Sequence, residues 1–196
     1  PMGNGTGKTF MLLAIASAIM FTTKHKLFQS IGIFKSWPYP KVLRIMSTSK
    51  MCEDSNAIQT AIRALFPPDR YTQTRGMGKA YYSQGKTDTG FMWDVMTYNQ
   101  EALEYAGSTI GAILASEPPP EDIFKECLAR LRGGGFIMVE ATPVNKGAYL
   151  KDQYIDKGIL SDPRTNKVVG KIICVPGDSH ENCRDHYPGG QLSHDD

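Results

Sequence analysis

The sequence lacks clustered cysteines and an excess of charge of either sign. Its four cysteines, Cys52, Cys127, Cys174 and Cys183, are dispersed and share no metal-binding spacing, which argues against a zinc framework and suits a reducing cytoplasm. The chain has 22 basic and 20 acidic residues, for a net charge of +2. It therefore has no general excess of positive charge for nucleic acid, and any contact with DNA must be local or belong to another part of the protein.

Long hydrophobic runs are also absent. No apolar stretch is long enough to cross a membrane, and no secretory signal peptide is visible. With 196 residues and 41% hydrophobic content, the chain is large enough to bury the core of one globular domain. We therefore expect a single globular domain without membrane contact.

What the sequence does contain, near its first residue, is a glycine-rich motif before an apolar helix pattern. The motif consists of Gly3, Asn4, Gly5, Thr6, Gly7, Lys8 and Thr9. Glycines let backbone N–H groups surround phosphate oxygens, and the N-terminus of the following helix adds partial positive charge. We expect Lys8 to contact the β- and γ-phosphates of ATP and Thr9 to ligate Mg²⁺. A plain glycine-rich turn before a core helix is the alternative interpretation.

The position and the first residue of this motif both depart from the usual P-loop pattern. A P-loop follows a buried strand, but only Pro1 and Met2 precede it here. We therefore expect this chain to be a fragment or an internal domain that lacks its first strand. Met2 stands where the pattern has a glycine, which should alter the entry to the loop while leaving Gly3, Gly5 and Gly7 to bind phosphate.

Apolar runs and helical periodicity alternate along the rest of the chain. Strands are expected at residues 41–48, 91–98, 109–115, 136–141 and 168–175. Helices are expected at residues 9–22, 54–65, 100–105, 119–131 and 147–157, and an exposed loop or hairpin at residues 68–90. This alternation predicts an α/β fold with a mostly parallel sheet covered by helices on both faces.

The expected strand at 109–115 is followed by Ser116, Glu117 and three prolines. In P-loop ATPases an acidic pair at the end of such a strand associates with Mg²⁺ and positions the attacking water. Here Glu117 takes the position of the catalytic glutamate, and Ser116 takes that of the Mg²⁺-associated aspartate. The alternative interpretation is that Glu117 only initiates a helix before the prolines.

A hydroxyl group follows the next apolar strand, at Thr142 before Pro143. A hydroxyl at the carboxyl edge of a neighbouring strand can sense the γ-phosphate through the attacking water. Taken alone, the Thr-Pro pair is better interpreted as an ordinary turn that ends the strand.

Taken in order, these motifs resemble the ATPase domain of the large terminase subunits of tailed bacteriophages, which are DNA-packaging motors. The resemblance is carried by the P-loop, by residues 96–108, by the Glu-Pro-Pro turn at 117–119 and by the Thr-Pro turn and glycine at 142–147. It covers nearly the whole chain. The P-loop alone is generic, whereas the succession of the last two turns is more specific.

The resemblance implies a RecA-like P-loop ATPase fold of the ASCE class over residues 1–196, with ATP and Mg²⁺ as cofactors. It implies Lys8 and Thr9 on the phosphates and Mg²⁺, and Ser116 in the metal-associated position. Glu117 would be the catalytic carboxylate, and Thr142 would belong to the motif that couples hydrolysis to movement.

The implied partners are double-stranded DNA, the portal protein, the small terminase subunit and further copies of the chain in a ring. The complex would act in the host cell cytoplasm, docked on the viral procapsid, without membrane contact. Members of this family also carry a nuclease domain after the ATPase, which would make the full-length protein an endonuclease. That domain would lie beyond Asp196.

Two other functions stay open on the sequence. A different P-loop translocase, such as a helicase core, would need a second RecA-like domain with arginine motifs. A catalytically weak nucleotide-binding assembly module is motivated by Ser116, a neutral residue in an acidic position. We also expect that Ser116→Asp would not harm the protein.

Overall fold

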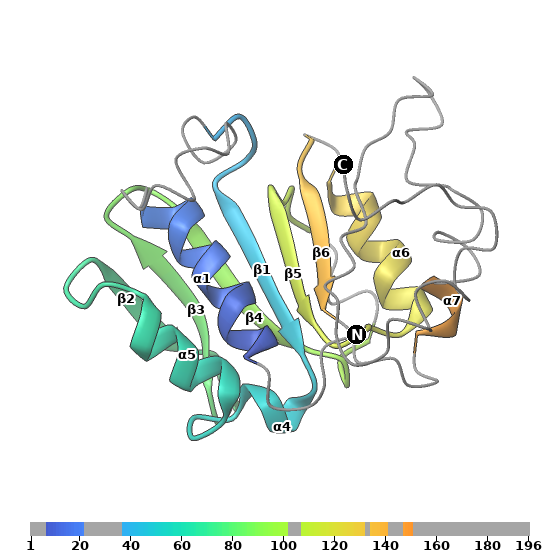
Figure 1. Ribbon diagram of the computed structural model, residues 1–196, viewed down its shortest axis with the longest axis horizontal. Helices are drawn as coiled ribbons and strands as arrows, with labels where there is room; N and C mark the ends of the chain where they lie inside the picture. The colour runs from blue at the N-terminus through green and yellow to red at the C-terminus, as the bar shows by residue number, and fades with distance from the viewer. Residues whose placement is uncertain (1–6, 22–36, 102–106, 132–133, 141–146, 151–196) are drawn as a thin grey trace, which may run out of the picture. The chain divides into compact units, whose positions relative to one another are not determined.

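The computed structural model describes residues 7–21, 37–101, 107–131, 134–140 and 147–150 (Figure 1). The chain divides into two compact units, Gly7–Glu140 and a second unit made of Pro1–Thr6 with Ala141–Asp196. In the second unit the described residues include the single-turn helix α7 (Ala148–Leu150). Among the described segments, no helix has the length and apolar character needed to cross a bilayer.

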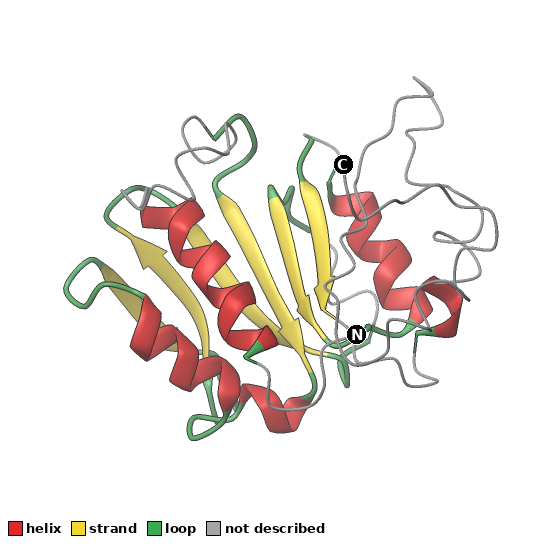
Figure 2. Cartoon of the chain, in the orientation of Figure 1, coloured by secondary structure: helices red, strands yellow, loops and turns green. Residues whose placement is uncertain are grey.

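A six-stranded sheet lies at the centre of the Gly7–Glu140 unit (Figures 1 and 2). Its strands are β1 (Val42–Ser47), β2 (Tyr71–Arg75), β3 (Tyr82–Thr87), β4 (Met92–Thr97), β5 (Ala112–Ser116) and β6 (Phe136–Glu140). They lie side by side in the order β2-β3-β4-β1-β5-β6. Strands β4, β1, β5 and β6 pair in parallel, while β2 and β3 pair antiparallel to their neighbours. The sheet is therefore mostly parallel, and the predicted α/β fold is confirmed at this level.

Helices pack on both faces of this sheet. The helices are α1 (Lys8–Phe21), α4 (Ser49–Cys52), α5 (Ala57–Leu65) and α6 (Glu121–Arg130). Successive side chains of a strand point to opposite faces, so Ile45 of β1 packs into one core cluster with α1 and α5, and Met46 into another with α6. In Figure 1, α1 and α5 cross in front of the strands.

Helix α1 is apolar along most of its length, and it packs against the sheet and against α5. Its buried residues include Leu12, Leu13 and Met20, and the Ser17 hydroxyl donates to the Leu65 carbonyl oxygen at 2.9 Å. Helix α5 ends at Leu65, and the backbone of the next residue, Phe66, is extended as expected for a residue before a proline. These contacts fix the direction of α1, and with it the position of the Lys8–Thr9 end.

Glycines allow the backbones to approach closely at the amino edge of the sheet. A Cβ placed on Gly111, just before β5, would lie 2.1 Å from the carbonyl oxygen of Pro40. A Cβ on Gly135, just before β6, would lie 2.3 Å from the carbonyl oxygen of Gly111, and Gly135 has a φ of +136°. Gly135 therefore allows β6 to dock closely against β5.

Most of the expected elements are present with shifted ends. The strands expected at 41–48, 91–98 and 136–141 are β1, β4 and β6, and the hairpin expected within 68–90 is β2 and β3. The strand expected at 109–115 begins later, at Ala112, and includes Ser116. Helix α4 was not expected. Most of the helix expected at 100–105, the end of that at 147–157 and the strand at 168–175 lie outside the described residues.

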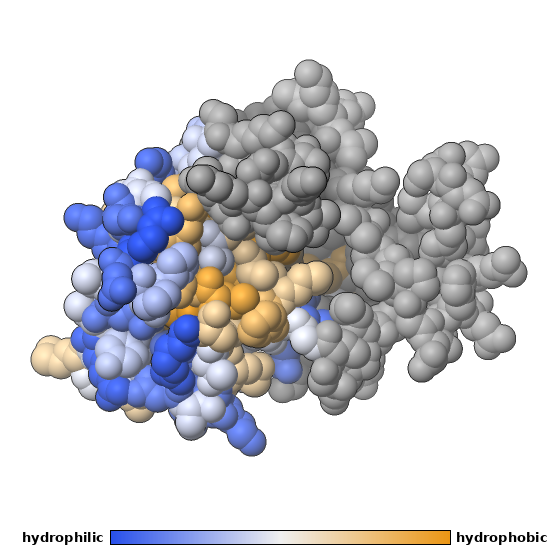
Figure 3. Space-filling model, turned by 60° about the vertical axis from the view of Figure 1, so that its left-hand side comes forward, coloured by the Kyte–Doolittle hydropathy of each residue, from blue (hydrophilic) through white to orange (hydrophobic). Residues whose placement is uncertain are grey.

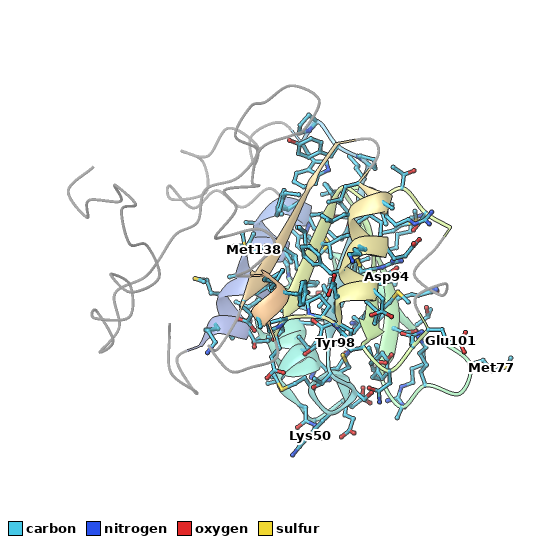
Figure 4. All side chains as sticks on the ribbon, turned by 90° about the vertical axis from the view of Figure 1, so that its right-hand side faces the viewer. Lys50, Met77, Asp94, Tyr98, Glu101 and Met138 are labelled. Atoms are coloured by element: carbon cyan, nitrogen blue, oxygen red, sulfur yellow. The ribbon has the colours of Figure 1, made fainter. Side chains whose placement is uncertain are left out.

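Hydrophobic side chains also reach the surface of the Gly7–Glu140 unit. On the face seen in Figure 3 they gather in one area, with hydrophilic side chains beside them. Phe10 and Met11 of α1 are each 49% exposed, directly after Lys8 and Thr9. Met77, in the turn between β2 and β3, is fully exposed and projects outward in Figure 4.

Candidate functional site

Polar residues end all four parallel strands at the same edge of the sheet. Ser47 of β1 pairs with Thr97 of β4, and Ser116 of β5 pairs with Glu140 of β6. Ser47 and Ser116 are buried, and the Ser47 hydroxyl donates to the Ser116 carbonyl oxygen at 3.2 Å. In parallel sheets of this kind, ligands bind at the carboxyl ends of the strands. This edge is the candidate functional site.

The N-terminus of α1 reaches this edge through Thr9. The Thr9 hydroxyl oxygen lies 3.0 Å from the Ser116 hydroxyl oxygen and donates to Oε1 of Glu140 at 2.7 Å. The Ser116 hydroxyl also donates to Oε1 of Glu140. Two of the residues predicted for the site, Thr9 and Ser116, are therefore in contact although they are far apart in the sequence.

Gly7 sets the backbone turn that leads into α1. Its φ is +76°, in the left-handed region that favours glycine, and a Cβ there would meet no atom within 4 Å. The requirement for glycine is therefore one of backbone conformation, not of space. The Gly7 carbonyl oxygen accepts a hydrogen bond from the Met11 N–H at 2.9 Å, and α1 begins at Lys8, which is half-buried.

The first turn of α1 supplies the chemistry expected of an anion-binding end. The first N–H groups of a helix have no partner within it and carry partial positive charge. The other predicted site residues of the glycine-rich motif and the Thr-Pro turn lie outside the described residues. They are Gly3, Asn4, Gly5, Thr6 and Thr142.

Glu117 follows β5 with a backbone that is uncommon for its residue type. Its φ is +69°, in the left-handed region, and its side chain is exposed. Tyr98, labelled in Figure 4, donates its hydroxyl to the Glu117 carbonyl oxygen at 2.7 Å. Within the described residues the Glu117 carboxylate has no hydrogen bond to Thr9, Ser116 or Glu140, so Glu117 stands beside that trio and is not part of it.

Glu140 is the site residue that sequence reasoning missed. It is the last residue of β6, one strand away from Ser116, and its Oε1 receives hydrogen bonds from both site hydroxyls. Its Oε2 is buried and has no hydrogen-bond partner among the described residues. The available signal was its position, an acid at the end of an apolar strand, which is the same signal that drew attention to Glu117.

The side chains of this trio are oxygen donors suited to a hard cation. Carboxylate and hydroxyl oxygens are the ligands that Mg²⁺ and Mn²⁺ prefer. Oε2 of Glu140, which is buried and has no hydrogen-bond partner in the described part of the chain, is compatible with such an ion. Among the described residues, no group of three or more His, Cys, Asp or Glu side chains could hold a metal ion. A cation here would therefore depend on hydroxyl groups as well as on the carboxylate.

Comparison of the chain with protein-family models, with curated proteins and with solved structures finds no match. The motifs and the geometry of the carboxyl edge are therefore the basis for assigning a function.

Proposed function

We propose that this chain is the ATP-hydrolysing motor domain of a viral large terminase, which drives double-stranded DNA into a procapsid. The observation that carries the proposal is the 3.0 Å contact between the hydroxyls of Thr9 and Ser116, which are 107 residues apart. Thr9 ends the Gly-Lys-Thr motif, and Ser116 ends the strand that precedes Glu117. A nucleotide-binding site of the P-loop class requires these two segments to meet.

In this proposal the residues predicted from the sequence have distinct tasks. The N–H groups at the start of α1 and the Lys8 ammonium bind the phosphate oxygens of ATP. Thr9 and Ser116 would hold a Mg²⁺ ion, which would supply positive charge to neutralise the phosphates. Glu117 orients the attacking water and accepts its proton. Thr142 belongs to the turn that couples hydrolysis to movement.

Nucleotide binding is the first test of the proposal. The Lys8→Ala variant should lose detectable ATP binding in titration calorimetry with Mg²⁺, because the ammonium contributes charge-assisted contacts to the phosphates. Lys86→Ala is the matched control, since Lys86 is an exposed lysine on β3, which is separated from β5 by two other strands. If Lys8→Ala binds ATP as tightly as the parent protein, residues 3–9 are not a P-loop.

The motor role needs a test of its own. Double-stranded DNA and procapsids that carry portal protein should stimulate ATP turnover by the full-length protein in the presence of the small subunit. ATP turnover that is unaffected by DNA and procapsids would contradict the packaging role but not the proposed nucleotide hydrolysis. These partners enter the proposal through the family resemblance of the motifs.

A second candidate function is a nucleotide-binding assembly module with weak or no turnover. The observation that favours it is Ser116, because a neutral hydroxyl stands where an ATPase of this class has an aspartate. Comparing ATP binding with ATP turnover separates the two candidates. Tight binding without turnover in the assembled complex would support the module.

A further inference from the structure

The surroundings of the Glu140 carboxylate suit a bound cation. Its Oε1 accepts from the hydroxyls of Thr9 and Ser116, and its Oε2 is buried without a hydrogen-bond partner among the described residues. A buried polar atom without a partner is unfavourable, and more so when the group is charged. A bound cation would remove that cost.

The contacts among Thr9, Ser116 and Glu140 also outnumber the hydrogens available to them. Each hydroxyl offers one hydrogen, and an ionised carboxylate offers none. The three oxygens, Oγ1 of Thr9, Oγ of Ser116 and Oε1 of Glu140, form three mutual contacts, for which only two hydrogens are available. One contact therefore brings two lone pairs together, which is unfavourable in a protein alone and favourable around a metal ion.

The spacing of these oxygens fits a small divalent ion. The Thr9–Ser116 and Thr9–Glu140 distances are 3.0 and 2.7 Å. Neighbouring oxygen ligands of an octahedral Mg²⁺, at about 2.0–2.1 Å from the metal, lie about 2.9 Å from one another. The trio has the spacing of adjacent ligands before any ion is bound.

The fold explains why the acid comes from β6. Ser116 and Glu140 are paired residues at the ends of adjacent parallel strands, so a carboxylate on either strand reaches the same point. The position that carries an aspartate in other ATPases of the proposed class is a serine here. The neighbouring strand provides the negative charge instead.

We propose that Glu140 is the carboxylate of a divalent-cation site that it forms with Thr9 and Ser116, in place of the acid that position 116 lacks. The site would serve Mg²⁺ bound with a nucleoside triphosphate, and this part rests on the proposed function. The cation site itself rests on the contacts of the three side chains.

Binding of Mn²⁺, followed by the electron paramagnetic resonance signal of the free ion, tests the proposal directly. The full chain is titrated with Mn²⁺ alone and again with ADP present. Glu140→Gln keeps the shape and an oxygen acceptor but removes the charge, and it should weaken Mn²⁺ binding at least about 10-fold. Asp122→Asn, at an exposed acid in the first turn of α6, should leave Mn²⁺ binding unchanged.

A double variant that moves the acid from one strand to the other tests whether Glu140→Gln loses Mn²⁺ binding through the lost charge and not through a structural defect. The double variant Ser116→Asp with Glu140→Gln moves the carboxylate from β6 to β5 and keeps the number of charges. It should recover most of the Mn²⁺ affinity that Glu140→Gln alone loses. A merely structural role for Glu140 would not be rescued by an acid at position 116.

The outcomes separate this inference from the proposed function. Unchanged Mn²⁺ affinity in Glu140→Gln, or a double variant that binds no better than the single one, overturns the cation site even if the protein binds ATP. Glu140-dependent Mn²⁺ binding with no ATP binding leaves the cation site standing and overturns the nucleotide site. If Glu140→Gln does not fold, the double variant decides: a folded double variant that binds Mn²⁺ supports the site, and any other result overturns it.

Discussion

The hydroxyl of Tyr98 donates a 2.7 Å hydrogen bond to the carbonyl oxygen of Glu117 and lies 3.2 Å from that of Ser116. Tyr98 follows β4, and Glu117 follows β5, so the bond reaches past the end of β1, which lies between them. It holds Glu117 in a left-handed backbone conformation that costs about 1–3 kcal/mol for a non-glycine residue. The backbone of Glu117 is therefore fixed while its carboxylate stays exposed.

Glu117→Gln should lower kcat about 10²–10⁴-fold with little change in the affinity for ATP. A carboxylate that orients water and accepts a proton acts in the transition state and contributes little to substrate binding. Steady-state ATP turnover and ATP titration of the assembled full-length protein measure the two quantities.

Asp69→Asn is the control for that variant. Asp69 is also an exposed acid with a positive φ, 66°, but it lies in the turn before β2. It should turn over ATP at the parent rate. Equal ATP turnover in Glu117→Gln and in the parent protein would mean that Glu117 only contributes to the turn before α6.

Local sequence patterns were sufficient to predict most of the elements, because each depends on its own residues. The apolar run of α1 and the apolar residues of β1, β4 and β5 are visible in any short window. The pairing of Arg44 with Asp94 is not visible in this way. Arg44 interrupts an otherwise apolar strand, and its acidic partner, 2.7 Å away, lies on β4.

The candidate site shows the same limit. Thr9 and Ser116 could be named because known motifs mark them. Glu140 could not, because its role depends on β6 lying next to β5 and on a contact with Thr9 across 131 positions of the sequence. Strand order is decided by packing of the whole sheet, and no local pattern reports it.

Ser116→Asp should destabilise the protein in the absence of a divalent cation. The new carboxylate would stand within hydrogen-bond reach of Oε1 of Glu140, and two like charges about 4 Å apart repel by about 1–4 kcal/mol. This differs from the expectation on sequence grounds, which had no knowledge of Glu140. Thermal unfolding in EDTA should show a lower midpoint than that of the parent.

Addition of Mg²⁺ should restore much of the lost stability of Ser116→Asp, because a cation between two carboxylates removes their repulsion. Ser47→Asp is not a suitable control, since Ser47 is buried at the same edge. Thr74→Asp, at an exposed position of β2 on the opposite side of the sheet from β6, adds the same charge away from the trio and should need no Mg²⁺. An unfolding midpoint of Ser116→Asp in EDTA equal to that of the parent would contradict the contact with Glu140.

Gly111→Ala should destabilise the Gly7–Glu140 unit by more than Gly78→Ala. A Cβ at Gly111 would lie 2.1 Å from the Pro40 carbonyl oxygen, so the backbone has to move, and overpacking of this kind costs about 1–3 kcal/mol or more. Gly78 has a φ of +73° and open space, so its substitution costs only the strain of the backbone, roughly 1–2 kcal/mol. Urea unfolding of both variants gives the comparison, and equal losses would contradict the close approach at the amino edge.

The buried thiols should make the protein less stable at alkaline pH. Burial raises the pKa of Cys52 and of Cys127 from 9.0 to about 12. Both thiols are therefore neutral in the folded protein, while in the unfolded chain they ionise near pH 9. Because the folded pKa is the higher one, this contribution to stability is complete below pH 9 and is lost progressively between pH 9 and about 12.

The slope of the unfolding free energy against pH between 9 and 11 measures this effect. Each thiol contributes at most roughly 1.4 kcal/mol per pH unit. Cys52→Ala and Cys127→Ala should each reduce the slope, even though the cavity that each leaves also lowers stability at pH 7. Other groups, such as Tyr71, whose pKa is also raised by burial, contribute equally in all three proteins and cancel in the comparison. A slope that is the same in the parent and in both variants would mean that the two thiols ionise in the folded protein as readily as in water.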